Sequence, residues 1–194
     1  MANRHTHFQV LDLPQRYAIN PAELEERYRE RSRHWHPDRF SRAPAAERTQ
    51  VLARATDLNE AYRVLRSDAR RAQYLLQLHG IDVAQEGPGN KLAVAPEFLM
   101  AILELREELG EARAAHDAAR LAALKDEMQR RTEELRQTLT DRFARLEAAT
   151  VEDSQRPALL AELTQAVLAQ RYYQRFFDEL ADYEDAQAEH AQSP

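Results

Sequence analysis

Histidine, proline, aspartate and arginine residues gather in one short stretch of the sequence, HWHPDRF at residues 34–40. Histidine can ligate a metal ion or transfer a proton, and aspartate can assist it in either role. However, His34 and His36 are two positions apart, which places them on different sides of a helix rather than on one ligand face. No acidic residue stands at the spacing of a metalloprotease motif, and no Ser or Cys nucleophile motif is present. We therefore expect no catalytic residue, no metal ligand and no cofactor here.

Two other interpretations of this stretch remain. It is either the end of a helix that Pro37 stops, or a loop presented to a partner. In the second case the fixed backbone angle of Pro37 gives the His36 ring and the Asp38 carboxylate a preset orientation. Asp38 would then pair with an arginine of the partner through a directional, charge-assisted contact. The elements on either side decide between the two interpretations.

Two amphipathic helices are predicted to flank the stretch. Asn20 and Pro21 are the residue types of a helix N-cap and a first helical position, and this helix must end before Pro37. Pro44 opens the second helix. Two helices of similar length joined by a short loop should pack antiparallel. Apolar residues at helical spacing predict one buried stripe on each: Leu24, Tyr28 and Trp35 on the first, and Val51, Ala55, Leu58, Tyr62 and Leu65 on the second.

Residues 1–80 are predicted to form a small domain of four helices. A short helix before Pro14 and another from Ser67 to His79, closed by Gly80, would cover the helix pair. This part of the chain has 14 Lys and Arg against 10 Asp and Glu, whereas the remainder has 13 against 23. Such a split in charge suggests two modules with different partners.

The composition is that of a helical protein. Among 194 residues there are only 4 Gly and no Cys, and Ala, Leu, Glu, Gln and Arg dominate. Without cysteine, the chain forms no disulfide and builds no thiolate-ligated zinc or iron–sulfur site by itself. We find no apolar signal region, and no apolar run of the roughly 20 residues that span a bilayer. We expect a soluble, cytoplasmic protein.

Residues 81–95 contain the tripeptide GPG and show no sustained periodicity, so they are predicted to be a linker. Residues 96–194 beyond it are predicted to form an antiparallel bundle of three amphipathic helices with short connections. Asp117 and Ser154 are the residue types of helix caps. The helical segments run over about 96–112, 117–149 and 155–187.

The first helix of the bundle has two apolar faces. On a helical wheel Phe98, Ile102, Leu105 and Leu109 fall within about 60° of each other and form a core stripe. A second face points nearly the other way and combines apolar and acidic residues: Leu99, Met100, Leu103, Glu104, Glu107 and Glu111. This face is either an exposed apolar patch rimmed by carboxylates, which suits protein binding, or it is covered by the linker or the first domain. Periodicity alone does not choose between them.

The order of motifs in the first domain resembles the J domain of DnaJ-type co-chaperones. HPDRF is followed by LNEAYRVL at residues 58–65 and DARRAQY at residues 68–74. The resemblance implies that a loop and its preceding helix engage a DnaK-type chaperone ATPase. The implied loop residues are His36, Pro37 and Asp38, and candidates for the accompanying basic face are Arg29, Arg33 and Arg39.

Arg29 and Arg31 lie on the predicted helix that precedes the loop. Arg29 has an alternative role, because it stands four residues after Glu25 and can pair with it along the helix. Arg31 lies on the apolar stripe of the first flanking helix, where J domains usually have an apolar residue. Its aliphatic stem can pack while its charged head reaches water.

A more specific resemblance covers nearly the whole chain. YLLQLHG at residues 74–80, FLMAILELREELGE at residues 98–111 and RFFDEL at residues 175–180 are similar to the HscB family, the J-protein co-chaperones of iron–sulfur cluster assembly. In that family the bundle binds the scaffold protein IscU. By position, the resemblance assigns this role to the second face of the first bundle helix and adds Phe176 of the last helix. Phe176 is predicted to lie on the flank of a core stripe formed by Leu159, Leu163, Ala166, Tyr173, Phe177 and Leu180.

These resemblances predict a non-enzymatic co-chaperone that stimulates the ATPase of the DnaK-type chaperone HscA and delivers IscU to it. One alternative is a J-domain co-chaperone for a different client. Another is a helical nucleic-acid binder that uses the arginines of residues 27–42, but the positive charge of the first domain is small for that role. We expect no nucleic acid and no membrane among the partners.

Overall fold

The computed structural model describes residues 5–83, 94–148 and 152–192. Throughout these residues the secondary structure is helical, which confirms the prediction of an all-α protein. The chain divides into two compact units, Met1–Gly80 and Ile81–Pro194. Most of the predicted linker, residues 84–93, lies outside the described residues. No helix in the described part of the chain is long and apolar enough to cross a membrane.

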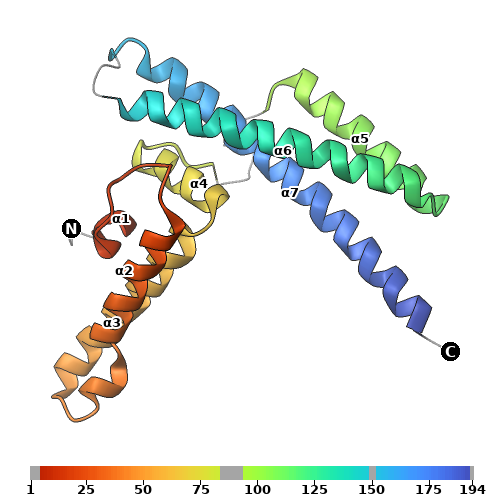
Figure 1. Cartoon of the computed structure of the whole chain (residues 1–194). Coiled ribbons are helices and arrows are strands. Elements are labelled where there is room, and N and C mark those ends of the chain that lie inside the picture. The colour runs from red at the N-terminus through yellow and green to blue at the C-terminus, as the bar shows by residue number, and fades with distance from the viewer. Residues whose placement is uncertain (1–4, 84–93, 149–151, 193–194) are drawn as a thin grey trace. The chain divides into compact units, whose positions relative to one another are not determined.

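The first unit begins with the short helix α1 (His7–Leu11) and the longer helix α2 (Pro21–His34) (Figure 1). The Thr6 side chain accepts a hydrogen bond from the Gln9 backbone at 3.2 Å, and Asn20 caps α2 in the same way by accepting from Ala22 at 2.9 Å. Pro21 is the first residue of α2, as predicted. A short 3₁₀ helix, η1 (Pro37–Phe40), then follows α2.

Helices α3 (Ala45–Leu65) and α4 (Asp68–Leu78) complete this unit. Helix α3 returns along α2, as Figure 1 shows, which confirms the predicted antiparallel pair. Gly80 ends α4 with φ +81°, a conformation that glycine adopts without strain. The core of the unit is formed by side chains from α1, α2, α3 and α4, including Phe8, Leu11, Leu24, Val51, Leu58, Leu65, Leu75 and Leu76.

Arg71 of α4 is buried within this core and fixes three segments together. Its guanidinium donates to the Tyr17 carbonyl at 2.7 Å and to the Leu65 carbonyl, and it also pairs with the Asp68 carboxylate. A buried charge is tolerated only when it is paired and hydrogen-bonded, and these contacts meet that condition. Arg71 is therefore a structural residue of the first unit.

The second unit contains α5 (Pro96–Ala114), α6 (Ala118–Glu147) and α7 (Arg156–Gln192), and each of these helices contacts the other two. The Asp117 side chain accepts from the Arg120 backbone at 3.0 Å and caps α6, as predicted. Ser154 is not a cap, because α7 begins at Arg156 and the Ser154 hydroxyl donates instead to Glu152 at 3.2 Å. The core beneath α5 includes Ile102, Leu105, Leu109, Leu124, Met128, Phe176 and Leu180.

Candidate functional site

The His36 loop lies between the end of α2 and the start of α3. His36 is the N-cap of η1, because its Nδ1 atom accepts a hydrogen bond from the Asp38 backbone N–H at 3.3 Å. The Asp38 carboxylate is 90% exposed, and its Oδ2 atom lies 3.6 Å from His36 Nδ1. The Pro37 side chain is outside the described part of the structure. The loop therefore presents a histidine and a nearly free carboxylate at the surface, with the backbone between them held in a helical turn.

The arginines predicted to flank the loop make contacts inside their own unit. Arg29 pairs with Glu25 at 2.8 Å, so the helical pairing considered for it is present. Arg33 donates through Nε to the Arg29 carbonyl at 3.3 Å, and Arg39 donates to the Arg33 carbonyl at 3.1 Å. All three side chains are exposed at the surface, and the contact between Arg39 and Arg33 joins the loop to the end of α2.

Tyr62 of α3 contacts two residues of α2. Its hydroxyl donates to the Glu25 carboxylate, and its ring stacks on Tyr28 with centroids 4.1 Å apart. This hydrogen bond, with a further one from Arg29, holds the pKa of Glu25 below its ordinary value. Tyr62 faces α2 as predicted but is half-buried rather than fully enclosed in the core.

Leu52 of α3 is an exposed apolar residue that we did not single out from the sequence. Its side chain is 60% exposed. Together with Tyr28, Trp35 and His36 it lines a hollow of about 290 Å³ between α2 and α3. The available signal was its position directly after the buried Val51, about 100° around the helix from the core stripe. His36 therefore borders a partly apolar surface.

The second face of α5 is at the surface of the bundle. Leu99, Met100 and Leu103 are 37%, 59% and 49% exposed, whereas Ile102 and Leu105 on the opposite face are buried. The acidic residues beside this patch are also exposed. Glu111 pairs with Arg120 of α6 at 3.1 Å, whereas Glu104 and Glu107 form no ion pair with any described residue. The α5 patch, defined as Leu99, Met100 and Leu103, is therefore apolar and has two unpaired carboxylates beside it.

Phe176 is not part of this surface. Its side chain is 1% exposed and belongs to the core, so its predicted place on the flank of the stripe was wrong. The predicted stripe was drawn from the periodicity of α7 alone. Around Phe176, in the middle of the helix, α7 packs against α5 as well as α6, which widens the buried arc to include this residue. In this conformation Phe176 stabilises the bundle and offers no contact to a partner.

The comparison with known families defines the class of protein first. Residues 6–74 match the DnaJ domain, and residues 94–181 match the HSCB C-terminal oligomerisation domain. The chain is therefore a J-domain protein whose second unit is a bundle of the HscB type.

Comparison with individual proteins then gives the family. Over 136 residues the chain is 41% identical to the co-chaperone protein HscB homolog of Burkholderia multivorans, which covers 68% of this chain and 76% of that relative. The fold is shared with the chaperone HscB from Vibrio cholerae, with TM-score 0.75, 24% identity and coverage of 94% of this chain and 99% of that one. It is also shared with human co-chaperone protein HscB, with TM-score 0.78, 22% identity and coverage of 95% and 84%. The chain belongs to the HscB family of J-domain co-chaperones.

Proposed function

We propose that this protein brings the iron–sulfur scaffold IscU to the DnaK-type chaperone HscA and stimulates the ATPase of that chaperone, and that it performs no chemistry of its own. The observation that carries the proposal is that each of the two compact units exposes one candidate docking surface, the His36 loop on the first and the α5 patch on the second. The His36 loop would contact the chaperone, and the α5 patch would hold the scaffold. Both partners would be met in the cytoplasm.

The geometry of the loop supports its role towards the chaperone. Because Nδ1 of His36 accepts the backbone N–H of Asp38, the neutral ring carries its proton on Nε2, which is then a donor for a partner. The Asp38 carboxylate is an acceptor suited to an arginine of the chaperone. The turn already fixes the backbone between the two residues, so binding costs less conformational entropy.

The composition of the α5 patch supports its role towards a client protein. Interfaces combine a few central apolar anchors with a polar rim, and Met100, the most exposed of the three apolar side chains, suits the centre. The unpaired carboxylates of Glu104 and Glu107 would attract a basic surface and speed association. By holding the scaffold on one unit and the chaperone on the other, the chain would raise the effective concentration of each for the other.

Single-turnover ATP hydrolysis by HscA, measured with the purified chain and with or without IscU, tests the proposal. The chain alone should accelerate hydrolysis, and IscU together with the chain should accelerate it further than either one does. Absence of stimulation by the full chain would reject the chaperone partner. Stimulation by the chain that IscU does not increase, together with no measurable binding of IscU, would reject the scaffold.

The burial of Phe176 supports a second candidate function, that of a J-domain co-chaperone with a different client. One of the residues that the family resemblance assigned to scaffold binding is enclosed in the core here, so the client surface rests on α5 alone. Under this alternative the chaperone would still respond to the loop, but IscU would not compete with the true client for the α5 patch.

A further inference from the structure

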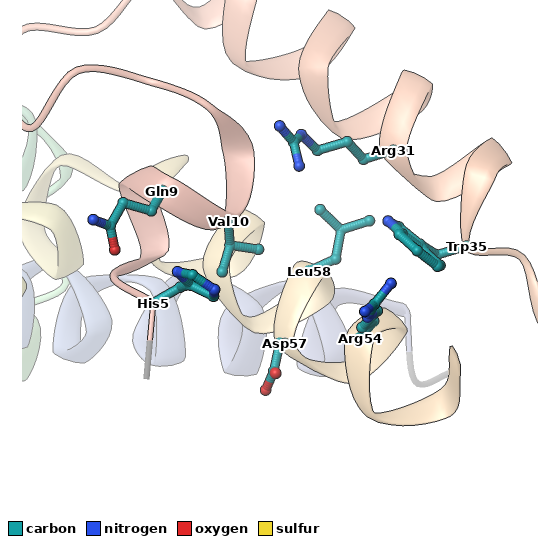
Figure 2. A pocket seen from close by; sticks show the side chains of 8 residues that line it. All are labelled: His5, Gln9, Val10, Arg31, Trp35, Arg54, Asp57 and Leu58. Carbon is teal, nitrogen blue, oxygen red and sulfur yellow. The ribbon is translucent and has the colours of Figure 1, made fainter. Parts of the chain in front are cut away.

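A hollow of about 270 Å³ lies within the first unit, where α1, α2 and α3 meet (Figure 2). Val10 of α1 and Leu58 of α3 give it apolar walls. Trp35 of α2 stands at one side, and Figure 2 shows Arg31 and Arg54 reaching towards this space from α2 and α3. His36 itself does not line this hollow, although Trp35 and Leu58 border both this hollow and the one beside the loop.

Positive charge in the hollow is poorly compensated. The nearest carboxylate to Arg31 is Asp12, at 3.8 Å, and Asp12 also pairs with Arg27 at 3.7 Å. Arg54 lies over the Trp35 ring at 4.2 Å and forms no ion pair with any described residue. His5 adds an imidazole to the lining, and the only carboxylate that lines this hollow is Asp57. The two guanidinium groups thus share the hollow with the carboxylate of Asp57, and Arg31 has only a part of the Asp12 carboxylate outside the lining.

Arg31 lines this hollow from α2. It stands on the face of α2 that carries the buried Leu24 and leads to Trp35 at the end of the helix, across the hollow from Val10 and Leu58. Its own side chain is 35% exposed, so its charge stays near the solvent. Filling such a space with an apolar residue often stabilises a domain, at a cost in function where the space serves as a site. The arginine at this position instead supplies a charged hydrogen-bond donor to the hollow.

We propose that the hollow binds a small organic anion, a carboxylate or a phosphate ester carried on a planar or branched apolar group. Arg31 and Arg54 would hold the oxyanion through charge-assisted hydrogen bonds, with His5 at the edge. The apolar group would rest against Val10 and Leu58 beside the Trp35 ring. The volume is below that of a typical drug-sized pocket, so the ligand is of fragment size.

Trp35 provides a direct measurement, because the chain has only 1 Trp. The indole N–H resonance of the full-length protein, followed by NMR, is free of other tryptophan signals. Because Trp35 also borders the hollow beside His36, the variants below assign a shift to one of the two hollows. Phenyl phosphate and benzoate serve as the anionic probes, and benzyl alcohol serves as the neutral one, at constant ionic strength set with KCl. Saturable shifts with either anion and none with the alcohol are expected.

Variants locate the binding within the molecule. Arg31→Gln and Arg54→Gln should each weaken binding about tenfold, because each removes a charged hydrogen-bond donor. Asp57→Asn should tighten it, since it removes the opposing carboxylate. Arg27→Gln is the control for positive charge near the hollow, because Arg27 does not line it. Since its loss leaves Asp12 to Arg31 alone, it should weaken binding, but much less than Arg31→Gln does.

Arg31→Leu gives a second, independent readout. It should abolish anion binding and raise the melting temperature, because the leucine closes the hollow. Absence of saturable shifts for both anions, or equal weakening in Arg27→Gln and Arg31→Gln, would overturn the proposal. These measurements use the purified chain without a chaperone, so their failure leaves the proposed co-chaperone function intact, and failure of that function leaves them intact.

Discussion

His36 owes its position to its own loop rather than to a neighbouring helix. The Nδ1 atom accepts the Asp38 N–H at 3.3 Å while the Asp38 carboxylate stands 3.6 Å from the same atom. The first contact requires that Nδ1 accepts, so the ring is oriented by the backbone of its own loop. Because both lie within three residues, a change at His36 acts on the loop and leaves the core alone.

We predict that His36→Gln removes ATPase stimulation while the fold is retained. The side chain is largely exposed, so the free energy of unfolding should change by no more than about 0.5 kcal/mol. Single-turnover ATPase assays with HscA and thermal unfolding give the two readouts. His34→Gln is the control, since His34 is exposed two positions earlier and should keep full stimulation. A variant at His36 that stimulates normally would remove the loop from the proposed function.

Tyr62→Phe should show a stability difference that depends on pH. Because the hydrogen bond from Tyr62 lowers the pKa of Glu25 from 4.5, it stabilises the fold above that pH, where Glu25 is ionised in both the folded and the unfolded chain. The stabilisation is lost as the pH falls through the lowered pKa and Glu25 takes up a proton. Chemical denaturation at pH 7 should therefore find Tyr62→Phe less stable than the natural protein, with the gap closing below pH 4.5. A gap of equal size at pH 7 and pH 3 would show that the hydrogen bond is not its origin.

Helix α5 has one buried and one exposed apolar face. Ile102, Leu105 and Leu109 lie on the face that is buried in the bundle. Beside them, Arg106 forms an ion pair with Glu179 of α7 at 2.5 Å. The α5 patch remains outside on the other face. A helix in a bundle needs one apolar face for folding, so the second face is free to be selected for binding.

We predict that Leu99→Ala, Met100→Ala and Leu103→Ala combined in one variant weaken IscU binding substantially and barely change stability. Alanine is a better helix former, and truncating exposed side chains leaves no cavity. Binding is measured by calorimetry, and unfolding by denaturant titration. The matched control is Ile102→Ala on the buried face, which should lose about 2–4 kcal/mol of stability.

The carboxylates beside the α5 patch should affect the rate of association with IscU more than the rate of dissociation. Glu104→Gln and Glu107→Gln together should slow association and flatten its dependence on salt, with a smaller effect on dissociation. A triple alanine variant that unfolds early but binds IscU normally would contradict the assignment of the α5 patch.

At the scale of the whole molecule, the two compact units have separate cores and opposite charge. The first unit has an excess of Arg, and the second has 23 acidic against 13 basic residues. The net charge of each unit favours partners whose net charge has the opposite sign. A division into separately packed units also means that a core mutation in one need not weaken the other.

We predict that scanning calorimetry shows a separate unfolding transition for each unit. Leu58→Ala removes a buried side chain of the first unit and Phe176→Ala removes one of the second, and each should cost about 2–5 kcal/mol. Each variant is expected to shift one transition and leave the other in place. A single transition that moves equally in both variants would show that the units unfold together.

Local features of the sequence determined the helices and the loop. Asn20 with Pro21, Asp117 and Gly80 marked helix ends correctly, because capping and glycine effects act within a few residues of the chain. The two faces of α5 were also correct, since one helix turn fixes the angle between neighbours. In the HWHPDRF stretch, the motif and its flanking helices together identified the J domain.

The tertiary structure alone decided the features that join distant segments. Phe176 is buried because α5 as well as α6 packs against the middle of α7, and a helical wheel drawn for one helix does not include its neighbours. Arg31 borders a hollow only because α1 and α3 bring Val10 and Arg54 to it. The Tyr62–Glu25 hydrogen bond arises from the register of α2 against α3. Contacts between helices are set by packing over the whole unit, and periodicity along one helix does not contain them.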